Sequence, residues 1–400
     1  MIITPHNEAI RYEYARGFGE WYRLKTGRTV SIDWRMVGGT SDIARFLEGE
    51  YTTAFENHWR RTLGRPWSAE VQNGFQRARL PAEASAAARE ARAAFLASDV
   101  GCGIDVFFGG GTYDLERQAR AGRLVDSGVM QLHPDWFTEK TIPRHFGGED
   151  YWHPDGLWIG TVLSSYGILY NRDALKRLGF EREPTRWDDL ADPRLIGEVG
   201  LADPTKSGSV ASVDPIGLLR GARHRTVACA FIEYTLSMEG QKLWNFKPGA
   251  PGGPQRFVLR RMPVRRDFYA QPAWQVWRSD PEESPFEQDD PLIYREAWTG
   301  KIFREMAFVI RVMCQDTHEE LRTAWRAIIV APEPAKSRAL AVLQDISAVN
   351  YERTTTGIHA RLSSKDKVDE VRVARELADV FRANYARAEA IATGRAGALR

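Results

Sequence analysis

The sequence has little cysteine. Its 400 residues contain three, Cys102, Cys229 and Cys314, and each lies more than 80 residues from the next. No two of them have the spacing of a metal or redox motif, and an odd number without close pairs gives no disulfide framework. We therefore expect all three to be small buried residues.

An excess of charge of one sign and long apolar runs are also missing. The 55 basic and 53 acidic residues leave a net charge of +2, so no global field favours nucleic acid or an acidic membrane surface. No apolar run approaches the roughly 18 residues of a membrane-spanning helix, since Arg311 interrupts the nearest candidate, 307–314. The first eight residues have neither the basic nor the apolar region of an export signal.

The sequence signatures of common enzymes are absent as well. It contains no Gly-x-Ser-x-Gly elbow, no phosphate loop and no Gly-x-Gly-x-x-Gly fingerprint. Its eight histidines include no pair at the helical spacing of a metal site. We therefore predict no catalytic residue, no metal ligand and no cofactor.

What is present is an α/β pattern rich in aromatic residues, which make up 11% of the chain. Apolar residues at steps of three and four predict a helix over 6–26, and alternation predicts a strand over 30–36. A glycine turn and a second helix follow. The apolar run 104–108, bounded by glycines, is typical of a strand covered on both faces. Helix, strand and glycine turn in this order indicate an α/β fold.

For the rest of the chain the sequence predicts the following helices and strands. Residues 50–98 read as a helical insertion, in which Thr53 and Glu56 have the spacing of a capping box. Further strands are predicted over 157–163, 166–170, 198–203 and 212–220. Helices are predicted over 173–178, 224–236, 294–329 and 367–393, with another beginning at Ser237 and an exposed loop at 280–291.

Three turns combine glycine or hydroxyl residues between a strand and a helix. They are Gly38–Ser41, Gly109–Thr112 and Thr205–Ser209. Such turns expose backbone N–H groups at the positive end of a helix, where an anion binds readily, although helix caps need the same residues. Three of them without catalytic partners favour binding over turnover.

Several motifs resemble the solute-binding proteins of ABC importers, in particular the ferric-iron-type family that also contains binders of phosphorylated organic solutes. The resemblance covers most of residues 2–270. The segments that carry it are Thr4–Glu8, Ser164–Asp173, Pro184–Leu190, Asp192–Leu195, Leu201–Ser209, Asp214–Gly221 and Phe231–Gln241.

The resemblance implies a two-lobed, type II periplasmic-binding-protein fold with a ligand cleft between α/β lobes and delivery to a membrane permease. We expect a first lobe at 1–160 with the helical insertion 50–98, and a partial second lobe at 161–211. Residues 212–262 would return to the first lobe, and 263–400 would form a C-terminal loop and helical region.

The chain departs from this family in two ways. The family is exported to the periplasm, whereas this sequence shows no signal peptide, and only Ile2 and Ile3 remain of a first strand. In addition, only eight residues separate the strands predicted at 198–203 and 212–220, whereas a crossover between parallel neighbours needs a dozen or more. The resemblance therefore implies that a block of the second lobe is missing near Ala211, which leaves that lobe incomplete.

The expected ligand is a small anionic or phosphorylated solute or ferric iron. Ferric iron prefers oxygen ligands such as paired tyrosines, yet no adjacent Tyr-Tyr pair occurs, so the anionic solute fits better. Arginines such as Arg220, Arg260 and Arg261 would either raise the potential of the cleft or form a solvated face. We expect the lobes to close on the solute, and we predict as hydrogen-bond donors His6, Thr40, Gly110, Gly111, Ser165, Ser207 and Gly208.

Two alternatives remain open at this point. One is an α/β enzyme acting on a phosphorylated small molecule, for which His6 is the evident titratable group. The other is a defective, truncated paralogue that binds no ligand. His6 itself would equally suit a role as a core or helix-capping residue.

Overall fold

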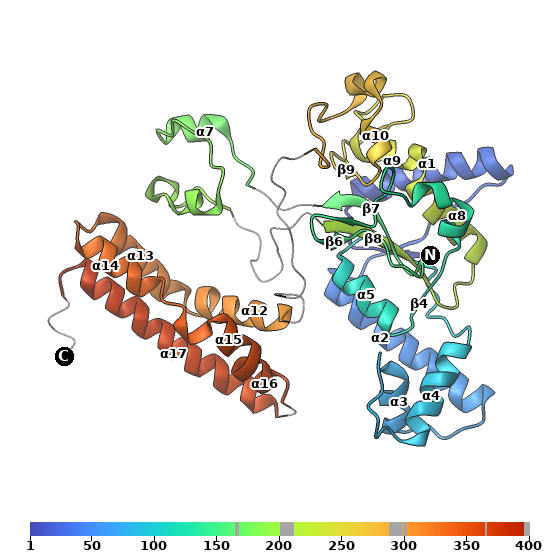
Figure 1. Ribbon diagram of the computed structural model, residues 1–400, viewed down its shortest axis with the longest axis horizontal. Helices are drawn as coiled ribbons and strands as arrows, with labels where there is room; N and C mark the ends of the chain where they lie inside the picture. Colours follow the sequence, from blue (N-terminus) through green and yellow to red (C-terminus); the bar gives the residue numbers. More distant parts are fainter. Residues whose placement is uncertain (165–167, 201–211, 288–297, 299–301, 365, 396–400) are drawn as a thin grey trace. The chain divides into compact units, whose positions relative to one another are not determined.

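The computed structural model describes residues 1–164, 168–200, 212–287, 298, 302–364 and 366–395, and the chain divides into two compact units (Figure 1). The first unit comprises residues 1–165 and 210–294. The second comprises residues 166–209 and 295–400. The chain therefore passes from one unit to the other three times, and each unit is described by itself below. The four lobe and region boundaries expected from the sequence stay predictions.

The first unit is built on a mixed sheet, which confirms the predicted α/β class. In the described residues the sheet has seven strands in the order β2-β1-β3-β8-β7-β9, with β4 paired beside β8. β1 is parallel to β2 and β3, whereas β8 is antiparallel to β3, β4 and β7. The strands are β1 (Ile2–Ile3), β2 (Trp34–Arg35), β3 (Val106–Phe108), β4 (Leu124–Val125), β7 (Ile159–Ser164), β8 (Ser212–Leu219) and β9 (Met262–Pro263), with β5 (His145–Phe146) and β6 (Glu149–Asp150) forming a separate pair.

Helices that the sequence predicts cover this sheet. α1 begins after Asn7, whose side chain accepts from the Ile10 N–H, and ends at Gly27 in the left-handed conformation. The side chain of Ser237 caps α9 in the same way, by accepting from the Gly240 N–H. The helices of this unit are α1 (Glu8–Thr26), α2 (Thr40–Asn57), α3 (Ala69–Gln76), α4 (Ala86–Ala97), α5 (Thr112–Arg120), α6 (Val129–Leu132), α8 (Arg225–Leu236), α9 (Met238–Asn245) and α10 (Arg266–Tyr269).

The helical insertion is present, but one of its predicted starts is wrong. Thr53 and Glu56 lie inside α2, which runs without a break from Thr40 to Asn57, so they do not begin a helix. The buried face of α2, including Leu47, Tyr51 and Phe55, continues through both positions, and this continuous packing overrides the local capping signal. Beyond α2, a π-helical turn at His58–Thr62 leads to α3 and α4, which pack against each other.

Two strand predictions are also corrected. Residues 168–170 and 198–200 form no strand in the described part of the chain, and the remainder of both predicted strands lies outside it. Within the described residues the partners of β8 are all antiparallel, so these pairings do not require the crossover expected between parallel neighbours. The crossover argument for a missing block near Ala211 therefore no longer applies, and the missing block stays a prediction.

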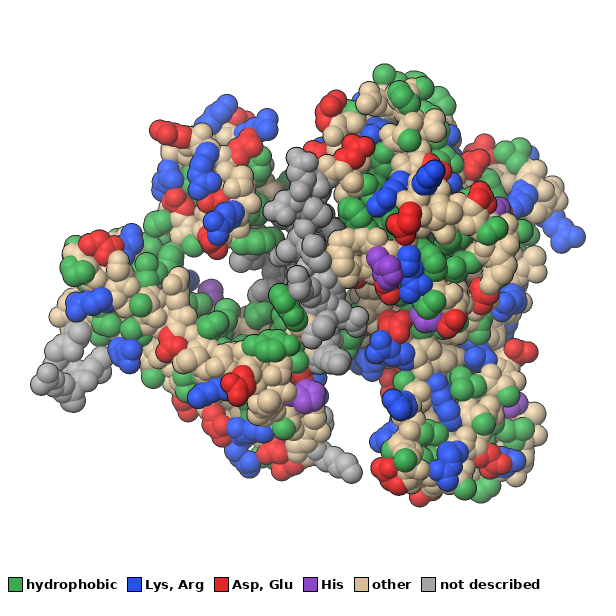
Figure 2. Space-filling model, viewed as in Figure 1, with side chains coloured by type: hydrophobic (Ala, Val, Ile, Leu, Met, Phe, Trp, Pro, Cys, Tyr) green, Lys and Arg blue, Asp and Glu red, His purple; other side chains and the backbone are tan. Residues whose placement is uncertain are grey.

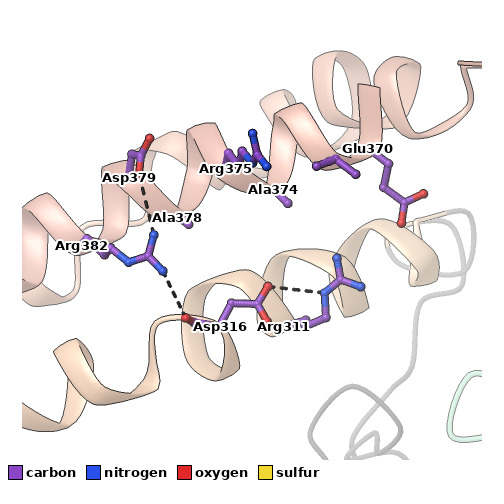
Figure 3. A pocket seen from close by; sticks show the side chains of 9 residues that line it. Arg311, Asp316, Glu370, Ala374, Arg375, Ala378, Asp379 and Arg382 are labelled. Carbon is purple, nitrogen blue, oxygen red and sulfur yellow. Dashed lines mark hydrogen bonds and ion pairs between the residues drawn. The ribbon is translucent and has the colours of Figure 1, made fainter. Parts of the chain in front are cut away.

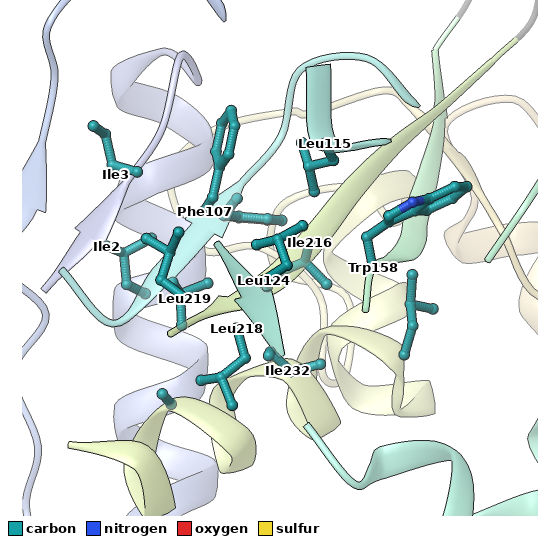
Figure 4. Packing of buried hydrophobic residues seen from close by; sticks show 14 of the residues in the cluster. Ile2, Ile3, Phe107, Leu115, Leu124, Trp158, Ile216, Leu218, Leu219 and Ile232 are labelled. Carbon is teal, nitrogen blue, oxygen red and sulfur yellow. The ribbon is translucent and has the colours of Figure 1, made fainter. Parts of the chain in front are cut away.

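The core of the first unit lies on both faces of the sheet. From Val213 to Leu219 every residue of β8 is buried, although successive side chains of a strand point to opposite faces. Figure 4 shows Phe107 and Leu115 on one side of the strands and Leu218 and Ile232 on the other. Helices α5 and α8 therefore enclose the sheet, as predicted for strand 104–108.

The second unit is helical in its described residues. The segment after β7 contributes α7 (Arg172–Arg177) and short 3-10 turns at Trp187–Ala191 and Pro193–Leu195. The C-terminal part forms a bundle with its own hydrophobic core, centred on residues such as Val312, Ile328 and Phe381. Its helices are α12 (Phe303–Ile310), α13 (His318–Val330), α14 (Ala335–Leu343), α15 (Tyr351–Arg353), α16 (His359–Leu362) and α17 (Lys367–Ala392), with π-helical turns at Arg311–Gln315 and Thr354–Ile358.

Candidate functional site

The candidate site lies where the three parallel strands of the first unit end. β1, β2 and β3 run side by side in the same direction, so their carboxyl ends lie at one edge of the sheet. β1 leads through His6 into α1, β2 leads through Gly38 and Gly39 into α2, and β3 leads through Gly109–Gly111 into α5. In open α/β sheets this edge is the usual place for a ligand.

Close contacts join the three turns. A Cβ atom at Gly109 would lie 2.4 Å from Cε1 of His6, so the imidazole packs directly on the Gly109 backbone. A Cβ atom at Gly110 would lie 2.4 Å from Cγ2 of Thr40 in the same manner. Both glycines also have positive φ angles, 91° and 103°, which side chains disfavour. Glycine at these two positions is what lets the turns of β1, β2 and β3 meet.

A carboxylate from β8 completes the cluster. Asp214 Oδ2 lies 3.4 Å from Nε2 of His6 and also forms an ion pair with Nη1 of Arg261. Asp214 is 8% exposed and His6 6%, whereas Arg261 is only partly buried. Backbone hydrogen bonds fix Arg261, since its N–H donates to the Trp244 carbonyl at 2.8 Å. One carboxylate thus holds a histidine and an arginine at this edge.

Burial favours the neutral form of the His6 ring. Burial lowers the pKa of His6, although the hydrogen bond and the charge of Asp214 oppose this shift. In a neutral ring that donates from Nε2 to Asp214, Nδ1 is an acceptor. Nδ1 is buried without a hydrogen-bond partner in the described structure, and so is Nε1 of Trp244, whose ring centroid lies 6.0 Å from that of His6. Two neighbouring rings of this site therefore each carry a buried polar atom without a partner.

The two helices that begin at the glycine turns have no side-chain cap. Gly39 precedes α2 and Gly111 precedes α5, and neither can supply a side-chain acceptor to the first N–H groups of its helix. The Asp42 carboxylate accepts from the Gly39 N–H at 3.0 Å, and the Thr112 hydroxyl donates to Glu149 at 3.3 Å. The positive ends of two helices therefore lie at the same edge, an arrangement that suits an anion.

Part of the site predicted from the sequence can be placed in the structure. His6, Thr40 and Gly110 are brought together, and Gly111 is the N-cap of α5 beside them. Ser165, Ser207 and Gly208, like the whole turn Thr205–Ser209, lie outside the described residues.

Sequence reasoning did not single out Asp214 as a site residue and listed Arg261 only among other arginines. The available signal was a charged residue inside an apolar strand, because Asp214 interrupts the run 212–219. The other arginines serve elsewhere: Arg220 donates to the carbonyls of Leu96, Ser98 and Gly122, and Arg260 pairs with Asp280.

The described residues contain no group of three His, Cys, Asp or Glu side chains suited to a metal ion, and none of their helices is long and apolar enough to cross a membrane. Basic and acidic side chains are interspersed on the face shown in Figure 2. Cys102 is buried as predicted, whereas Cys229 and Cys314 are only partly buried.

Comparison with protein families supports the resemblance. Residues 104–213, from β3 to the start of β8, match the family described as bacterial extracellular solute-binding protein. The predicted family is therefore confirmed over this part of the chain, which carries a segment of a family of binding proteins rather than enzymes. An uncharacterized protein of Haemophilus influenzae is 34% identical over 106 residues; the match spans 26% of this chain and only 28% of that relative.

Several solved structures have a low overall similarity to this chain. One is the periplasmic binding protein AfuA of Actinobacillus pleuropneumoniae with fructose-6-phosphate bound, at 14% identity and TM-score 0.39 over 72% of this chain and 88% of that one. Another is iron-bound HitA of Pseudomonas aeruginosa, at 15% identity and TM-score 0.35 over 74% and 93%. The periplasmic binding protein P5PA gives 14% and 0.39 over 76% and 93%.

Proposed function

We propose that this chain is the solute-binding component of an ABC importer and holds a small anionic or phosphorylated solute at the carboxyl edge of β1, β2 and β3. The observation that carries the proposal is the convergence of His6, Thr40 and Gly110 with two glycine-capped helix N-termini at that edge. Delivery to a membrane permease and a periplasmic location are parts of the same proposal, and they rest on the family match of residues 104–213.

The hydrogen-bond donors at the edge favour an anion over bare ferric iron. The first N–H groups of α2 and α5 and the partly exposed guanidinium of Arg261 are donors, and a phosphate accepts from all of them. Ferric iron needs several oxygen ligands, and the described residues group no three carboxylate, histidine or cysteine side chains. Iron remains the second candidate solute, because one similar structure is described as iron-bound.

Thermal unfolding with defined solutes tests the proposal. We would compare inorganic phosphate, fructose 6-phosphate and ferric ion as probes. A solute held by the native state at about 100 times its Kd adds about 2.7 kcal/mol of stability, which raises the Tm by several degrees. Thr40→Ala should reduce that rise, whereas Thr53→Ala, the same substitution on an exposed residue of α2, should leave it unchanged.

The two alternative readings predict other results. If no probe raises the Tm, the chain behaves as the defective paralogue and the proposal is wrong for these solutes. If fructose 6-phosphate is consumed, with release of inorganic phosphate, the chain is an enzyme. His6→Ala would then abolish turnover.

A further inference from the structure

Paired charges line the groove along α17 in the C-terminal bundle (Figure 3). Arg311 forms an ion pair with Asp316 at 3.7 Å, and Arg382 forms one with Asp379 at 3.8 Å. These charges are therefore compensated within the chain. A pocket of the first unit differs in this respect, because its hydrogen-bond donors are used within the chain whereas two of its acceptors are not.

This pocket lies on the first unit, where α1, α9 and the loop 247–255 meet, and we call it the α1–α9 pocket. Its volume is about 460 Å³, which is in the range of pockets that hold small molecules. Trp21 and Leu24 of α1, Leu243 of α9 and Ala250 of the loop give it an apolar lining. None of the residues that we place at the carboxyl edge of the sheet lines it.

The hydroxyl group of Tyr234 is an unpartnered polar group at this pocket. Tyr234 is only 2% exposed and lines the pocket. A Cβ atom at Gly17, which also lines the pocket, would collide with the hydroxyl oxygen, so this end of the ring lies at the pocket wall. The hydroxyl forms no hydrogen bond with any residue that the structure describes. A buried hydroxyl without a partner costs free energy, so a ligand group that pairs with it is favoured.

The charges around this hydroxyl are mainly negative. Burial raises the pKa of the Tyr234 hydroxyl most, and the charge of Arg16 opposes that rise. Three carboxylates add to the rise, those of Glu239, Glu20 and Glu13. Glu239 is exposed and has no ion-pair partner in the described part of the chain. The neutral hydroxyl and the Glu239 carboxylate are therefore two acceptors that a cationic donor would satisfy.

The donors of the same pocket are already used. The guanidinium of Arg16 donates to the carboxylates of Glu13 and Glu20 at 3.3 and 3.4 Å. Its Nη2 donates to the Gly253 carbonyl at 3.1 Å. In the loop 247–254 three N–H groups donate to loop carbonyls at 2.8–3.1 Å, and the three prolines have no N–H group. An anion would therefore find few donors here.

We propose that the α1–α9 pocket binds a small organic cation, a protonated amine carried on an apolar body. The ammonium group donates to the Tyr234 hydroxyl oxygen and lies beside the Glu239 carboxylate, and the apolar body packs on Trp21 and Leu243. The Trp21 ring already accommodates one cation. Lys25 Nζ lies 4.5 Å from the ring centre, and its charge is paired with a carboxylate of α8.

Three probes of different charge test the proposal on the full chain. Phenethylamine carries the cation, phenethyl alcohol is its neutral counterpart, and phenylacetate carries a negative charge. In isothermal titration calorimetry at neutral pH we expect the amine to bind at least about tenfold more tightly than the alcohol, because its hydrogen bond is charge-assisted. Phenylacetate should not displace the amine. Salt should weaken binding of the amine, because Glu239 is exposed.

Substitution of the two unpaired acceptors distinguishes this pocket from binding elsewhere. Tyr234→Phe keeps the ring and its packing but removes the hydroxyl, and it should raise the Kd of phenethylamine roughly tenfold. Glu239→Gln should raise that Kd about two- to threefold, since this carboxylate is exposed. The matched controls are Tyr12→Phe, at an exposed tyrosine of α1, and Glu70→Gln, in the first turn of α3. Both controls should leave the Kd unchanged.

The Tm of each variant without a probe shows whether its fold is intact. Thr40→Ala should leave the Kd of phenethylamine unchanged, because Thr40 does not line the pocket. Displacement of the amine by fructose 6-phosphate would place it at the carboxyl edge of the sheet and overturn the proposal. Equal affinities for the amine and the alcohol, or no binding at millimolar concentrations, would also overturn it. So would folded Tyr234→Phe and Glu239→Gln variants that bind the amine as tightly as the wild type.

Discussion

The Asp214 carboxylate on β8 lies 3.4 Å from Nε2 of His6, and the two residues are 208 positions apart in the chain. Both are almost wholly buried, and Arg261 holds the other side of the carboxylate. The pair ties the turn after β1 to the strand at the centre of the sheet. Burial outweighs the opposing effect of Asp214 and lowers the pKa of His6, so protonation of the buried ring opposes folding.

Acid should therefore destabilise the protein through His6. Burial lowers the pKa of His6 in the folded state, whereas the unfolded ring titrates near its ordinary value of about 6.5. The unfolded chain thus binds the proton first, and stability falls as the pH drops below about 6.5 towards the folded pKa. His6→Gln should flatten this part of the pH profile of the Tm, whereas His318→Gln, at an exposed site, should not. Equal slopes for the wild type and His6→Gln would contradict this assignment.

A second buried carboxylate should stabilise the loop before Arg261. Glu13 on α1 accepts backbone N–H bonds from Gln255, Arg256 and Phe257 at 2.7–2.9 Å. Although burial favours the protonated form, these donors and Arg16 lower the pKa of Glu13 on balance. We expect Glu13→Gln to cost about 1–3 kcal/mol of unfolding free energy at pH 7, because N–H groups lose charged acceptors.

The lowered pKa of Glu13 also predicts how the effect of Glu13→Gln on stability changes with pH. A lowered carboxyl pKa contributes stability above the unfolded value of about 4.3, and that stability is lost as the pH falls through the folded pKa. The difference between wild type and Glu13→Gln in urea unfolding should therefore shrink on acidification. Glu20→Gln, on the exposed side of the same helix, serves as the control.

The close approach of the turns predicts an effect at Gly110. Alanine there would meet Thr40 Cγ2 at 2.4 Å and would be held at φ 103°, so we expect a loss of about 1–3 kcal/mol. Gly103→Ala isolates the backbone contribution, since φ is 79° and a Cβ atom meets nothing within 4 Å. The double variant Gly110→Ala/Thr40→Ser removes the methyl group and should recover the steric part in thermal melts. A Gly110→Ala variant no less stable than Gly103→Ala would argue against the contact.

Arg220 should hold the helical insertion on the sheet. Its guanidinium donates to Leu96 and Ser98, at the end of α4, and to Gly122, after α5, at 2.6–3.0 Å. Arg220→Met leaves these carbonyls unpaired, so we expect a loss of about 1–3 kcal/mol and faster amide hydrogen exchange in α4. Arg223→Met, at an exposed neighbouring position, is the control. Unchanged exchange in α4 would show that other contacts hold the insertion.

The sequence predicted well those elements whose signals are local. The helix at Glu8–Thr26 ends at Gly27 as its pattern indicates, and the helix at Met238–Asn245 begins after the Ser237 cap. The long helix Lys367–Ala392 follows its apolar period. Helical hydrogen bonds join residues four apart, so periodicity and caps within a short window contain most of the necessary information.

The incorrect predictions arise where packing against distant residues, and not the local pattern, decides the structure. The alternation at 30–36 predicts a full strand, yet only Trp34–Arg35 pairs with β1, which itself has two residues. The capping box at Thr53 and Glu56 is overridden because the buried face of α2 continues past it. In each case packing against distant residues, which a local window does not contain, decides the outcome.

The sequence by itself determined the α/β class, the solute-binding resemblance and the glycine turns at Gly38–Ser41 and Gly109–Thr112. Only the tertiary structure decided that His6, Thr40 and Gly110 meet and that Asp214 joins them. It also decided that β8 runs antiparallel to β3 and β7. The physical reason is that turn and helix chemistry acts between near neighbours in the chain, whereas strand order and the pairing of buried charges depend on which distant segments share one core.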